Sequence, residues 1–304
     1  MRTVDLAIIG AGTAGLTAAA TAAAHGIDVL VIEQLAPGGQ IATVERIRNF
    51  PGFAEGIGGY ELGPMLQAQA AEAGADFLLD SVTRIEPAEG GGFLVHAAED
   101  TVSARTVLLA MGSRRRTLDV PGEAELEGRG VSHCAACDGH FFRGKAVVVA
   151  GGGDSAFDEA EVLAEHVGQV TIVHDGAAPV AQARTVERVT ALPNVRVIAG
   201  ARVSAVEGAS EVERILLDGA PAEPAAGLFV YVGLVPNSAI VADLVEIDAA
   251  GRIVADASFE TAQQGLFVAG DLRSGAVALL ASAAGDGAAA ALAAVRHLRA
   301  MERR

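Results

Sequence analysis

The sequence feature that most constrains the fold is a glycine-rich turn that occurs twice, each time between an apolar run and a segment with helical character. The first copy is "VDLAIIGAGTAGLTAAATAAAHGIDVLVIE", residues 4–33, and the second is "KAVVVAGGGDSAFDEAEVLAEHVGQVTIVHD", residues 145–175. Each copy reads as a strand, a tight turn, a helix and a second strand. The sequence therefore predicts two βαβ units of the Rossmann type.

Both turns have the spacing of a dinucleotide-binding motif. Its small residues are Gly10, Gly12 and Gly15 in the first copy and Gly151, Gly153 and Ala156 in the second. The first glycine allows the turn, the second lets a pyrophosphate approach the backbone, and the third position lets helix and strand pack closely. An acidic residue ends each copy: Glu33 and Asp175 lie 23 and 24 positions after the first glycine (33 − 10 and 175 − 151). We therefore expect two dinucleotide sites.

Another strand-like run comes near the C-terminal end. The segment "GLFVAGDLRSGAVALLASAAGDGAAAALAAV", residues 265–295, predicts a strand, then Gly270 and Asp271, then a long helix. We expect this segment to return to the first βαβ unit, which makes the second unit an insertion. The expected fold class is therefore α/β, with two Rossmann-like domains, doubly wound and three-layered, the second inserted in the first.

Composition and charge favour a globular cytoplasmic protein. Of the 304 residues, 51% are hydrophobic, and a net charge of −16 without a long basic tract argues against nucleic-acid binding. Residues 6–24 carry no charge, but three glycines interrupt them. We interpret them as a buried strand, turn and helix and not as a membrane span or signal peptide. We expect no membrane partner and a cytoplasmic location.

The chain has two cysteines, Cys134 and Cys137, just ahead of the second glycine turn. Two intervening residues allow such a pair to close a disulfide ring at a helix start. Asp138 is suited either to proton transfer with a thiol or to capping a turn, and His133 is more typical of a polar turn residue than of a thiolate-stabilising cation. No second pair completes a zinc site, so we expect no metal. Two dinucleotide sites beside a cysteine pair indicate a flavoprotein oxidoreductase with FAD in one site.

Several further motifs carry a family resemblance. The pieces "GAGTAG", "PGGQ", "NFPGF", "LLAMGS", "CAACDG", "GGGDSA", "GLFVYVGLVPN" and "GLFVAGD" occur in the order and spacing of low-molecular-weight thioredoxin reductases, which the chain resembles over nearly its whole length. The resemblance implies a homodimer in which residues 1–114 and 240–304 form a discontinuous FAD-binding domain. Residues 115–239 would form an inserted pyridine-nucleotide-type domain that carries the CxxC motif and rotates between flavin and substrate.

The resemblance also implies roles for individual residues. Cys137 would meet the flavin, Cys134 would attack the substrate disulfide, and Asp138 would manage the proton. The FAD-binding residues would be Gly10, Gly12, Thr13, Ala14, Gly15, Glu33, Gly39, Gln40, Asn49, Gly112 and Asp271. The residues of a possible nicotinamide nucleotide site would be Gly151, Gly153, Asp154, Ser155, Ala156 and Asp175.

The sequence departs from the family where the 2′-phosphate of NADPH is held. The family usually has the motif HRRxxxR there, whose arginines supply fixed positive charge. This chain reads "HDGAAPV", residues 174–180, so Asp175, Gly176 and Val180 take the arginine positions. A carboxylate at Asp175 would repel a 2′-phosphate and suit the free hydroxyls of NADH. We therefore expect NADH, or no nicotinamide nucleotide, in preference to NADPH.

A second departure follows Asp271, where Ala278 and Leu279 replace an Arg-Gln pair that the family commonly has near the flavin. The two departures place the chain among divergent thioredoxin reductase-like flavoproteins. The leading interpretation is an FAD-dependent dithiol–disulfide oxidoreductase that passes electrons through flavin and the Cys134–Cys137 pair to thioredoxin or a similar small protein, with NADH, ferredoxin or another donor. Two alternatives stay open: an oxidase of small dithiols that uses oxygen, and a slow flavin redox sensor or electron-transfer protein.

Overall fold

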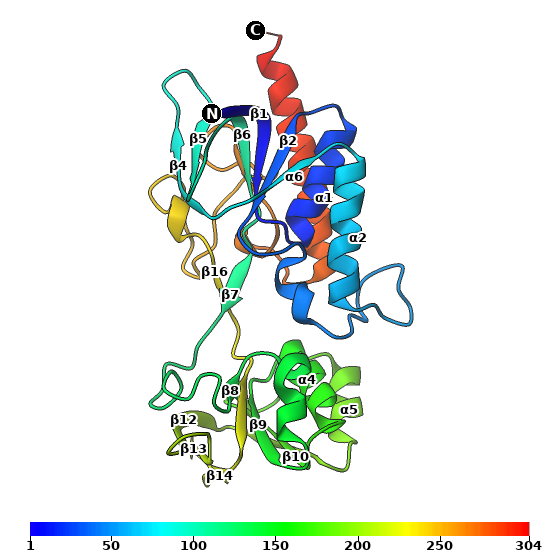
Figure 1. The fold of residues 1–304 in the computed structure, drawn as a ribbon, viewed down its shortest axis with the longest axis vertical. Coiled ribbons are helices and arrows are strands. Elements are labelled where there is room, and N and C mark those ends of the chain that lie inside the picture. The colour runs from blue at the N-terminus through cyan, green and yellow to red at the C-terminus, as the bar shows by residue number, and fades with distance from the viewer. Residues whose placement is uncertain (304) are drawn as a thin grey trace. The chain divides into compact units, whose positions relative to one another are not determined.

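The computed structural model of this chain describes residues 1–303 and divides into two compact units. The first unit comprises Met1–Arg114 with Pro236–Arg304, and the second comprises Arg115–Val235; the expected domain boundaries lie after residues 114 and 239. Each unit is built on a mainly parallel sheet, which confirms the expected α/β fold class (Figure 1). The chain passes between the units in two short strands that pair with each other, β7 (Ser113–Arg115) and β16 (Leu234–Pro236).

The first unit contains a seven-stranded sheet. Its strands are β1 (Arg2–Ile9), β2 (Val29–Glu33), β3 (Asp76–Leu79), β4 (Val82–Pro87), β5 (Phe93–Ala97), β6 (Thr101–Leu109) and β17 (Leu266–Val268). The order is β3-β2-β1-β6-β5-β4, and β17 pairs with the C-terminal part of β6. Strands β1, β2, β3, β6 and β17 run parallel, whereas β5 pairs antiparallel with both β4 and β6. The carboxyl ends of β1, β6 and β17 therefore meet at one edge of the sheet.

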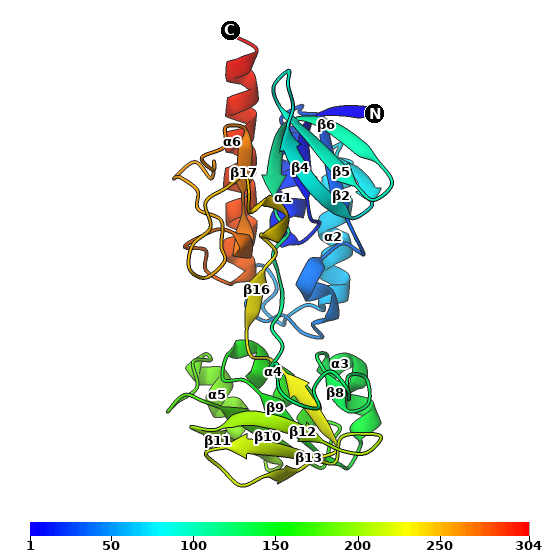
Figure 2. The same cartoon turned by 90° about the vertical axis from the view of Figure 1, so that its left-hand side faces the viewer.

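Three helices cover one face of this sheet, α1 (Thr13–Ala24), α2 (Gly59–Glu72) and α6 (Leu280–Met301) (Figure 1). Figure 2 shows α6 and β17 side by side. Small residues let α1 and α6 approach at backbone distance: a Cβ at Gly287 would lie 2.1 Å from the carbonyl oxygen of Ala14. The short 3₁₀ turns of this unit are η1 (Gly39–Thr43), η3 (Ala239–Val241) and η4 (Gly270–Leu272).

The uncharged stretch at residues 6–24 forms the end of β1, the first glycine turn and all of α1, as expected. Its apolar side chains belong to the two cores that line the faces of the sheet. Within residues 1–303, no helix is both long enough and apolar enough to cross a membrane.

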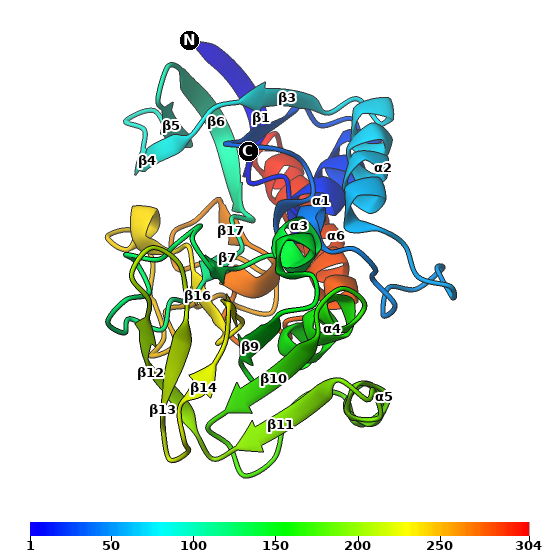
Figure 3. The ribbon, with the colours of Figure 1, turned by 60° about the horizontal axis from the view of Figure 1, so that its bottom comes forward.

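The second unit has three layers (Figure 3). Its five-stranded parallel sheet has the order β11-β10-β9-β15-β8, with bounds β8 (Val131–Ser132), β9 (Ala146–Ala150), β10 (Gln169–His174), β11 (Val195–Ala199) and β15 (Gly227–Val230). One face packs on the helical segments α3 (Ala135–Asp138), η2 (Gly139–Phe142), α4 (Asp154–Ala164) and α5 (Ala183–Thr190). The other face packs on a three-stranded antiparallel sheet, β12 (Arg202–Glu207), β13 (Arg214–Asp218) and β14 (Glu223–Pro224).

Candidate active site

The first glycine turn joins β1 to α1 and leaves one side of its backbone open. Gly10 has a φ of 102°, and a Cβ there would lie 2.6 Å from the carbonyl oxygen of Ala110. A Cβ at Gly15 would lie 1.9 Å from the carbonyl oxygen of Gly10. The chain itself therefore requires glycine at both positions. A Cβ at Gly12, by contrast, would meet nothing within 4 Å, so this side of the turn is free for a ligand to approach.

The start of α1 has the properties of an anion site. Its N-cap residue, Gly12, provides no side-chain cap, so the first N–H groups of the helix point toward the open side of the turn. The hydroxyl of Thr13 is buried there and has no hydrogen-bond partner among the described residues. A pyrophosphate would supply an acceptor for the first N–H groups of α1 and for the Thr13 hydroxyl. These residues therefore fit the phosphates of a dinucleotide.

Glu33 is held beside the same turn. It ends β2, next to β1 in the sheet, and its carboxylate accepts hydrogen bonds from the backbone N–H groups of Ala11 at 2.8 Å and Leu35 at 3.0 Å. The two bonds fix the carboxylate at the carboxyl end of the sheet. This is where the ribose of a dinucleotide lies in folds of this type.

Other predicted FAD residues converge on the same sheet edge. Gly39 starts η1, and a Cβ there would lie 3.2 Å from the Cα of Gly12. Gln40 donates from Nε2 to the carbonyl oxygen of Ser113 at 3.1 Å. Gly112 has a φ of 57° and accepts the backbone N–H of Asn237 at 3.0 Å.

Asp271 and Asn49 complete the predicted FAD set. Asp271 lies in η4, where a Cβ at Gly270 would be 3.0 Å from the Cβ of Ala14. Burial raises the pKa of Asp271; Arg252 opposes the shift and Asp286 adds to it. Asn49 lies exposed in the loop between η1 and α2.

The two cysteines form a disulfide at the start of α3, with their Cα atoms 5.3 Å apart. Cys134 is the N-cap residue of α3, and its Sγ accepts a hydrogen bond from the backbone N–H of Cys137 at 3.2 Å. After reduction the same bond would stabilise a thiolate at Cys134, because a charged acceptor strengthens a hydrogen bond.

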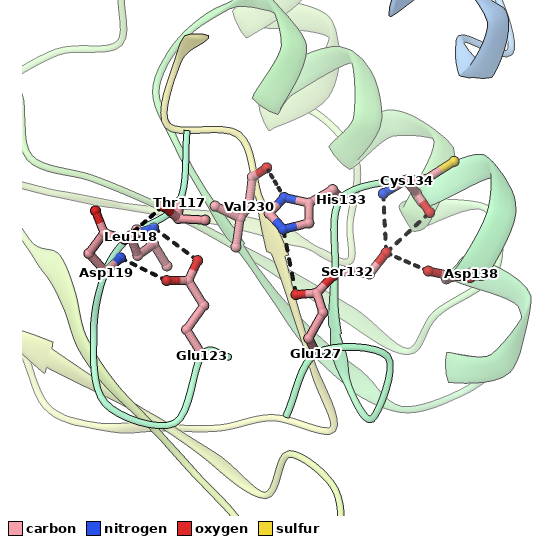
Figure 4. Close-up of polar contacts among 10 residues, drawn as sticks. All are labelled: Thr117, Leu118, Asp119, Glu123, Glu127, Ser132, His133, Cys134, Asp138 and Val230. Carbon is pink, nitrogen blue, oxygen red and sulfur yellow. Dashed lines mark hydrogen bonds and ion pairs between the residues drawn. The ribbon is translucent and has the colours of Figure 1, made fainter. Parts of the chain in front are cut away.

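Ser132 orients Asp138, the residue that follows Cys137. The Ser132 hydroxyl donates to Asp138 Oδ2 at 2.6 Å, and the same oxygen accepts the backbone N–H of Cys134 at 3.1 Å (Figure 4). A cavity of about 340 Å³ opens beside this pair. Its lining includes Ser132, Asp138, Phe141, Phe142, Arg129 and Lys145. Asp138 therefore reaches solvent through a cavity that it shares with Ser132.

The His133 ring points away from the sulfur of Cys134 (Figure 4). Its Nδ1 lies 3.4 Å from the carbonyl oxygen of Val230, and its Nε2 lies 3.6 Å from Oε2 of Glu127. These contacts fit the expected polar turn residue better than a cation that stabilises the Cys134 thiolate.

A partly buried pair behind α3, Tyr231 and Glu159, is not predicted from the sequence. Tyr231, just after β15, accepts the backbone N–H of Ala135 at 3.1 Å and donates its hydroxyl to Oε2 of Glu159 at 3.3 Å. Burial raises the pKa of Glu159 to about 7, while the bond from Tyr231 lowers it. The sequence does not distinguish Glu159 from the neighbouring Asp158 and Glu161, and nothing local connects it with the cysteines.

The second glycine turn joins β9 to α4 and resembles the first. Gly151 has a φ of 140°, and a Cβ there would lie 2.3 Å from the carbonyl oxygen of Tyr231 and 3.1 Å from the Cβ of Ala156. A Cβ at Gly153 would meet nothing within 4 Å, and no side chain caps α4. His174, at the end of β10, is buried against Gly152, and its Nε2 has no hydrogen-bond partner among the described residues. This turn also retains a free approach for a phosphate.

The segment in place of the arginine motif folds back onto this turn. The backbone N–H groups of Val180 and Ala181 donate to the carbonyl oxygen of Gly152 at 2.8 and 3.2 Å. Gln182 donates from its backbone and its side chain to the carboxylate of Asp154 at 2.7 and 3.1 Å. Asp154 therefore holds the returning chain, and Ser155 next to it is exposed.

Two charged residues around this segment pair with residues of opposite charge. Asp175 is exposed and forms an ion pair of 3.3 Å with Arg202, at the start of β12. Arg188 lies on α5 and donates to the carboxylate of Glu161 at 2.8 and 3.1 Å. The position of Arg202 beside Asp175 was missed, because 27 residues separate them (202 − 175).

The second departure from the family, Ala278 and Leu279 in place of an Arg-Gln pair, lies at the start of α6. Leu279 is the N-cap residue of α6 and provides no side-chain hydrogen bond. Leu279 and Val277 are both exposed, so an apolar surface precedes the helix where the family has polar side chains.

Two dinucleotide-type glycine turns, one of them beside a redox-active cysteine pair, define a flavin- and nucleotide-linked disulfide oxidoreductase. Comparison with known proteins agrees. Residues 4–287 match the family of pyridine nucleotide-disulphide oxidoreductases. The thioredoxin reductase of Treponema pallidum is 38% identical over 299 residues, which cover 97% of each chain.

Solved structures extend the comparison. The thioredoxin reductase of Lactococcus lactis, in its FR conformation, is 33% identical with a TM-score of 0.94, over 98% of this chain and 99% of that one. A ferredoxin-flavin thioredoxin reductase from Clostridium acetobutylicum is 28% identical with a TM-score of 0.54, over 100% of both chains. The chain belongs to the thioredoxin reductases, and it is a flavoprotein disulfide oxidoreductase. Membership implies sites for FAD and for a nicotinamide nucleotide.

Proposed function

We propose that this protein is an FAD-dependent reductase of thioredoxin or a similar small protein, and that NADPH is not its preferred electron donor. The substrate part is supported by the relatives, which are named thioredoxin reductases. The donor part is carried by one observation: Asp175 and a folded-back backbone stand where the family has phosphate-binding arginines.

The cysteine pair performs the exchange with the substrate. In the reduced pair, the Cys134 thiolate attacks the substrate disulfide, and one substrate sulfur leaves as a thiolate. Cys137 then attacks Cys134 of the mixed disulfide, so the Cys134–Cys137 bond forms and the substrate is released as a dithiol. The hydrogen bond from the Cys137 N–H to the Cys134 sulfur supports this order, because it favours the thiolate at Cys134. Asp138, oriented by Ser132, takes and returns the proton of Cys137.

The first unit provides the place for FAD. When bound, FAD supplies two-electron transfer between the donor and the disulfide. The turn at Gly12, the Thr13 hydroxyl and the α1 N-terminus would hold its pyrophosphate, and Glu33 its adenosine ribose. Asp271 and Gln40 would contact the half that carries the flavin.

The donor follows from electrostatics at the second turn. A 2′-phosphate carries negative charge and would lie close to the exposed carboxylate of Asp175. Arg202 already pairs with that carboxylate, so its charge is not fully available to a phosphate. NADH has a 2′-hydroxyl that a carboxylate can accept, and we therefore propose NADH as the nicotinamide donor.

Ferredoxin is the second candidate donor. The full-length similarity to a ferredoxin-flavin thioredoxin reductase is the observation that favours it. In that case the second glycine turn would serve only the fold of the second unit.

An anaerobic titration decides between the donors. NADH, NADPH and reduced ferredoxin are added separately to the purified holoenzyme while flavin absorbance is followed. Stoichiometric bleaching by NADH or ferredoxin, followed by reduction of thioredoxin, supports the proposal. Rapid bleaching by micromolar NADPH overturns its donor part. Oxygen consumption driven by a small dithiol without any nucleotide would indicate the reverse activity, and flavin reduction without disulfide turnover would indicate a sensor.

The family resemblance also leads us to propose a cytoplasmic homodimer whose FAD-binding domain is discontinuous. Light scattering on the holoenzyme measures the oligomeric state directly. A molar mass close to 61 kDa, twice the 30.7 kDa of one chain, is expected.

A further inference from the structure

A partly buried carboxyl group lies behind the redox pair, and the proposed electron path does not use it. Glu159 is in the middle of α4, and its Oε2 accepts the hydroxyl of Tyr231 at 3.3 Å. The Tyr231 oxygen accepts the backbone N–H of Ala135 at 3.1 Å. Ala135 follows Cys134 and begins α3. The Tyr231 hydroxyl therefore links the Glu159 carboxyl to the backbone of the redox helix, and the Ala135 N–H itself also lowers the pKa of that carboxyl.

We propose that Glu159 is a positioning residue that stores a proton for the Cys134–Cys137 pair, taking up one proton when the disulfide is reduced and releasing it when the disulfide forms again. This inference rests on the proposed redox cycling of the pair. Reduction adds two electrons and breaks the S–S bond. Cys137 takes one proton as a thiol, Cys134 remains a thiolate, and Glu159 takes the second proton. The reductant is the flavin in turnover, or an external dithiol.

The physical reason is repulsion between two negative charges in a partly buried region. Burial raises the pKa of Glu159 to about 7, so near neutral pH a small change in local charge decides whether it holds a proton. A new thiolate at Cys134 is such a change, because it disfavours a carboxylate nearby.

The other charges near Glu159 do not remove the coupling between the charge on Cys134 and the protonation of Glu159. Arg115 lowers the pKa of Glu159, and Asp158 of the same helix raises it. Arg188, which faces α4 from α5, is engaged with Glu161 and Asp158. Burial raises the pKa of Tyr231 well above its ordinary value, so its hydroxyl stays protonated and keeps donating to Glu159.

The test is the pH dependence of the disulfide equilibrium in the holoenzyme. The protein is equilibrated with oxidised and reduced dithiothreitol between pH 6 and 8.5, quenched and alkylated. Since the chain has two cysteines, counting alkylated thiols measures this pair alone. Around pH 7, the midpoint potential of the pair, obtained from the exchange constant and the pH-dependent potential of dithiothreitol, should change about 30 mV less per pH unit in the Glu159→Gln variant than in the wild type, which is a factor of ten per pH unit in the equilibrium constant of the pair's own reduction.

Two further variants make the comparison specific. Tyr231→Phe removes a hydrogen bond that lowers the pKa of Glu159 and should move the steep region to higher pH. Glu165→Gln removes the same charge from an exposed position at the end of α4 and should leave the wild-type slope unchanged.

A Glu159→Gln slope equal to that of the wild type overturns the proton store. Should this variant not fold, infrared difference spectra of the wild type at pH 7 decide: a protonated-carboxyl band must grow when the disulfide is reduced, and its absence overturns the proposal. The assay needs neither nucleotide nor thioredoxin, so it is independent of the donor and the substrate. A pair that does not exchange with dithiothreitol at all overturns the redox role of the cysteines as well.

Discussion

Ser132 donates a hydrogen bond of 2.6 Å to the carboxylate of Asp138, and its oxygen accepts the backbone N–H of Cys134 at 3.1 Å. One buried hydroxyl at the end of β8 therefore orients both the proposed proton carrier and the first cysteine. Because Ser132 belongs to the sheet, this orientation is set by the rigid part of the unit and not by the short helix α3.

Replacing Ser132 with alanine should slow disulfide exchange without loss of flavin. A hydrogen bond to a charged group is worth about 1.5–3 kcal/mol, so we expect at least about a ten-fold fall in turnover. Steady-state thioredoxin reduction and the flavin absorbance ratio measure the two effects. Ser204→Ala, the same change on β12, is the control. Turnover that stays at the wild-type level would show that Asp138 does not depend on Ser132.

The proposed order of the cysteines predicts which variant traps the substrate. With Cys137→Ser, the Cys134 thiolate still attacks but cannot be displaced, so a mixed disulfide with thioredoxin should accumulate. With Cys134→Ser no such adduct should form. Non-reducing electrophoresis and intact mass measure the adduct. Trapping by the Cys134 variant in place of the Cys137 variant would reverse the two roles.

The Thr13 hydroxyl predicts a contribution to FAD affinity. It is buried without a partner, and a bond to phosphate is worth about 1.5–3 kcal/mol, so Thr13→Val should weaken FAD binding about ten-fold or more. The apoprotein should lose no stability, since a methyl group replaces an unpaired hydroxyl. Flavin fluorescence titration of the apoprotein measures the affinity, with Thr17→Val on the same helix as control. Unchanged affinity would mean that this hydroxyl faces no phosphate.

Features that depend on local sequence could be predicted. The strand expected at Val4–Ile9 is β1, Glu33 ends β2, and the strand expected to end near Asp175 is β10, which ends one residue earlier. Apolar runs, tight glycine spacing and helix starts are written within a few residues of one another, so they can be read without tertiary contacts.

Features that depend on contacts between distant segments could not be predicted. Tyr231 and Ala135 are 96 residues apart, and their hydrogen bond exists only because β15 ends beside α3. The bonds from Val180 and Ala181 to Gly152 likewise depend on how the segment after β10 returns. The position of Asp175 in the motif can be read from the sequence, but its partner Arg202 comes from another sheet. Such pairs follow from topology, which residue types alone do not specify.

Glu159 makes the stability of the protein pH-dependent in a defined direction. Its pKa rises from 4.5 to about 7 on folding. Between these values the folded chain binds more protons than the unfolded chain, so the free energy of unfolding falls as pH rises and levels off above about pH 7. The loss is about 3 kcal/mol at most, and less because the side chain is only partly buried. Urea unfolding at several pH values should show this component in the wild type but not in Glu159→Gln. A wild-type-like pH profile in the variant would contradict the shift.

Asp175 and Arg202 together predict how the nucleotide preference can be changed. NADPH should reduce the wild type at least ten-fold less effectively than NADH, because even one missing arginine contact of about 1.5 kcal/mol is a factor of ten. Asp175→Ala should weaken the binding of NADH, because it removes the acceptor for the ribose hydroxyl. The same change should strengthen the binding of NADPH, because it removes a repelling charge and frees Arg202 to face the phosphate. The double variant Asp175→Ala with Arg202→Ala should lose most of that gain in NADPH affinity, which separates the freed cation from the lost repulsion. Stopped-flow flavin reduction at varied nucleotide concentration measures each affinity.

If Asp175→Ala leaves the ratio of the NADH and NADPH affinities unchanged, this carboxylate does not face the ribose. If neither nucleotide reduces the flavin of any variant, the second glycine turn binds no electron donor.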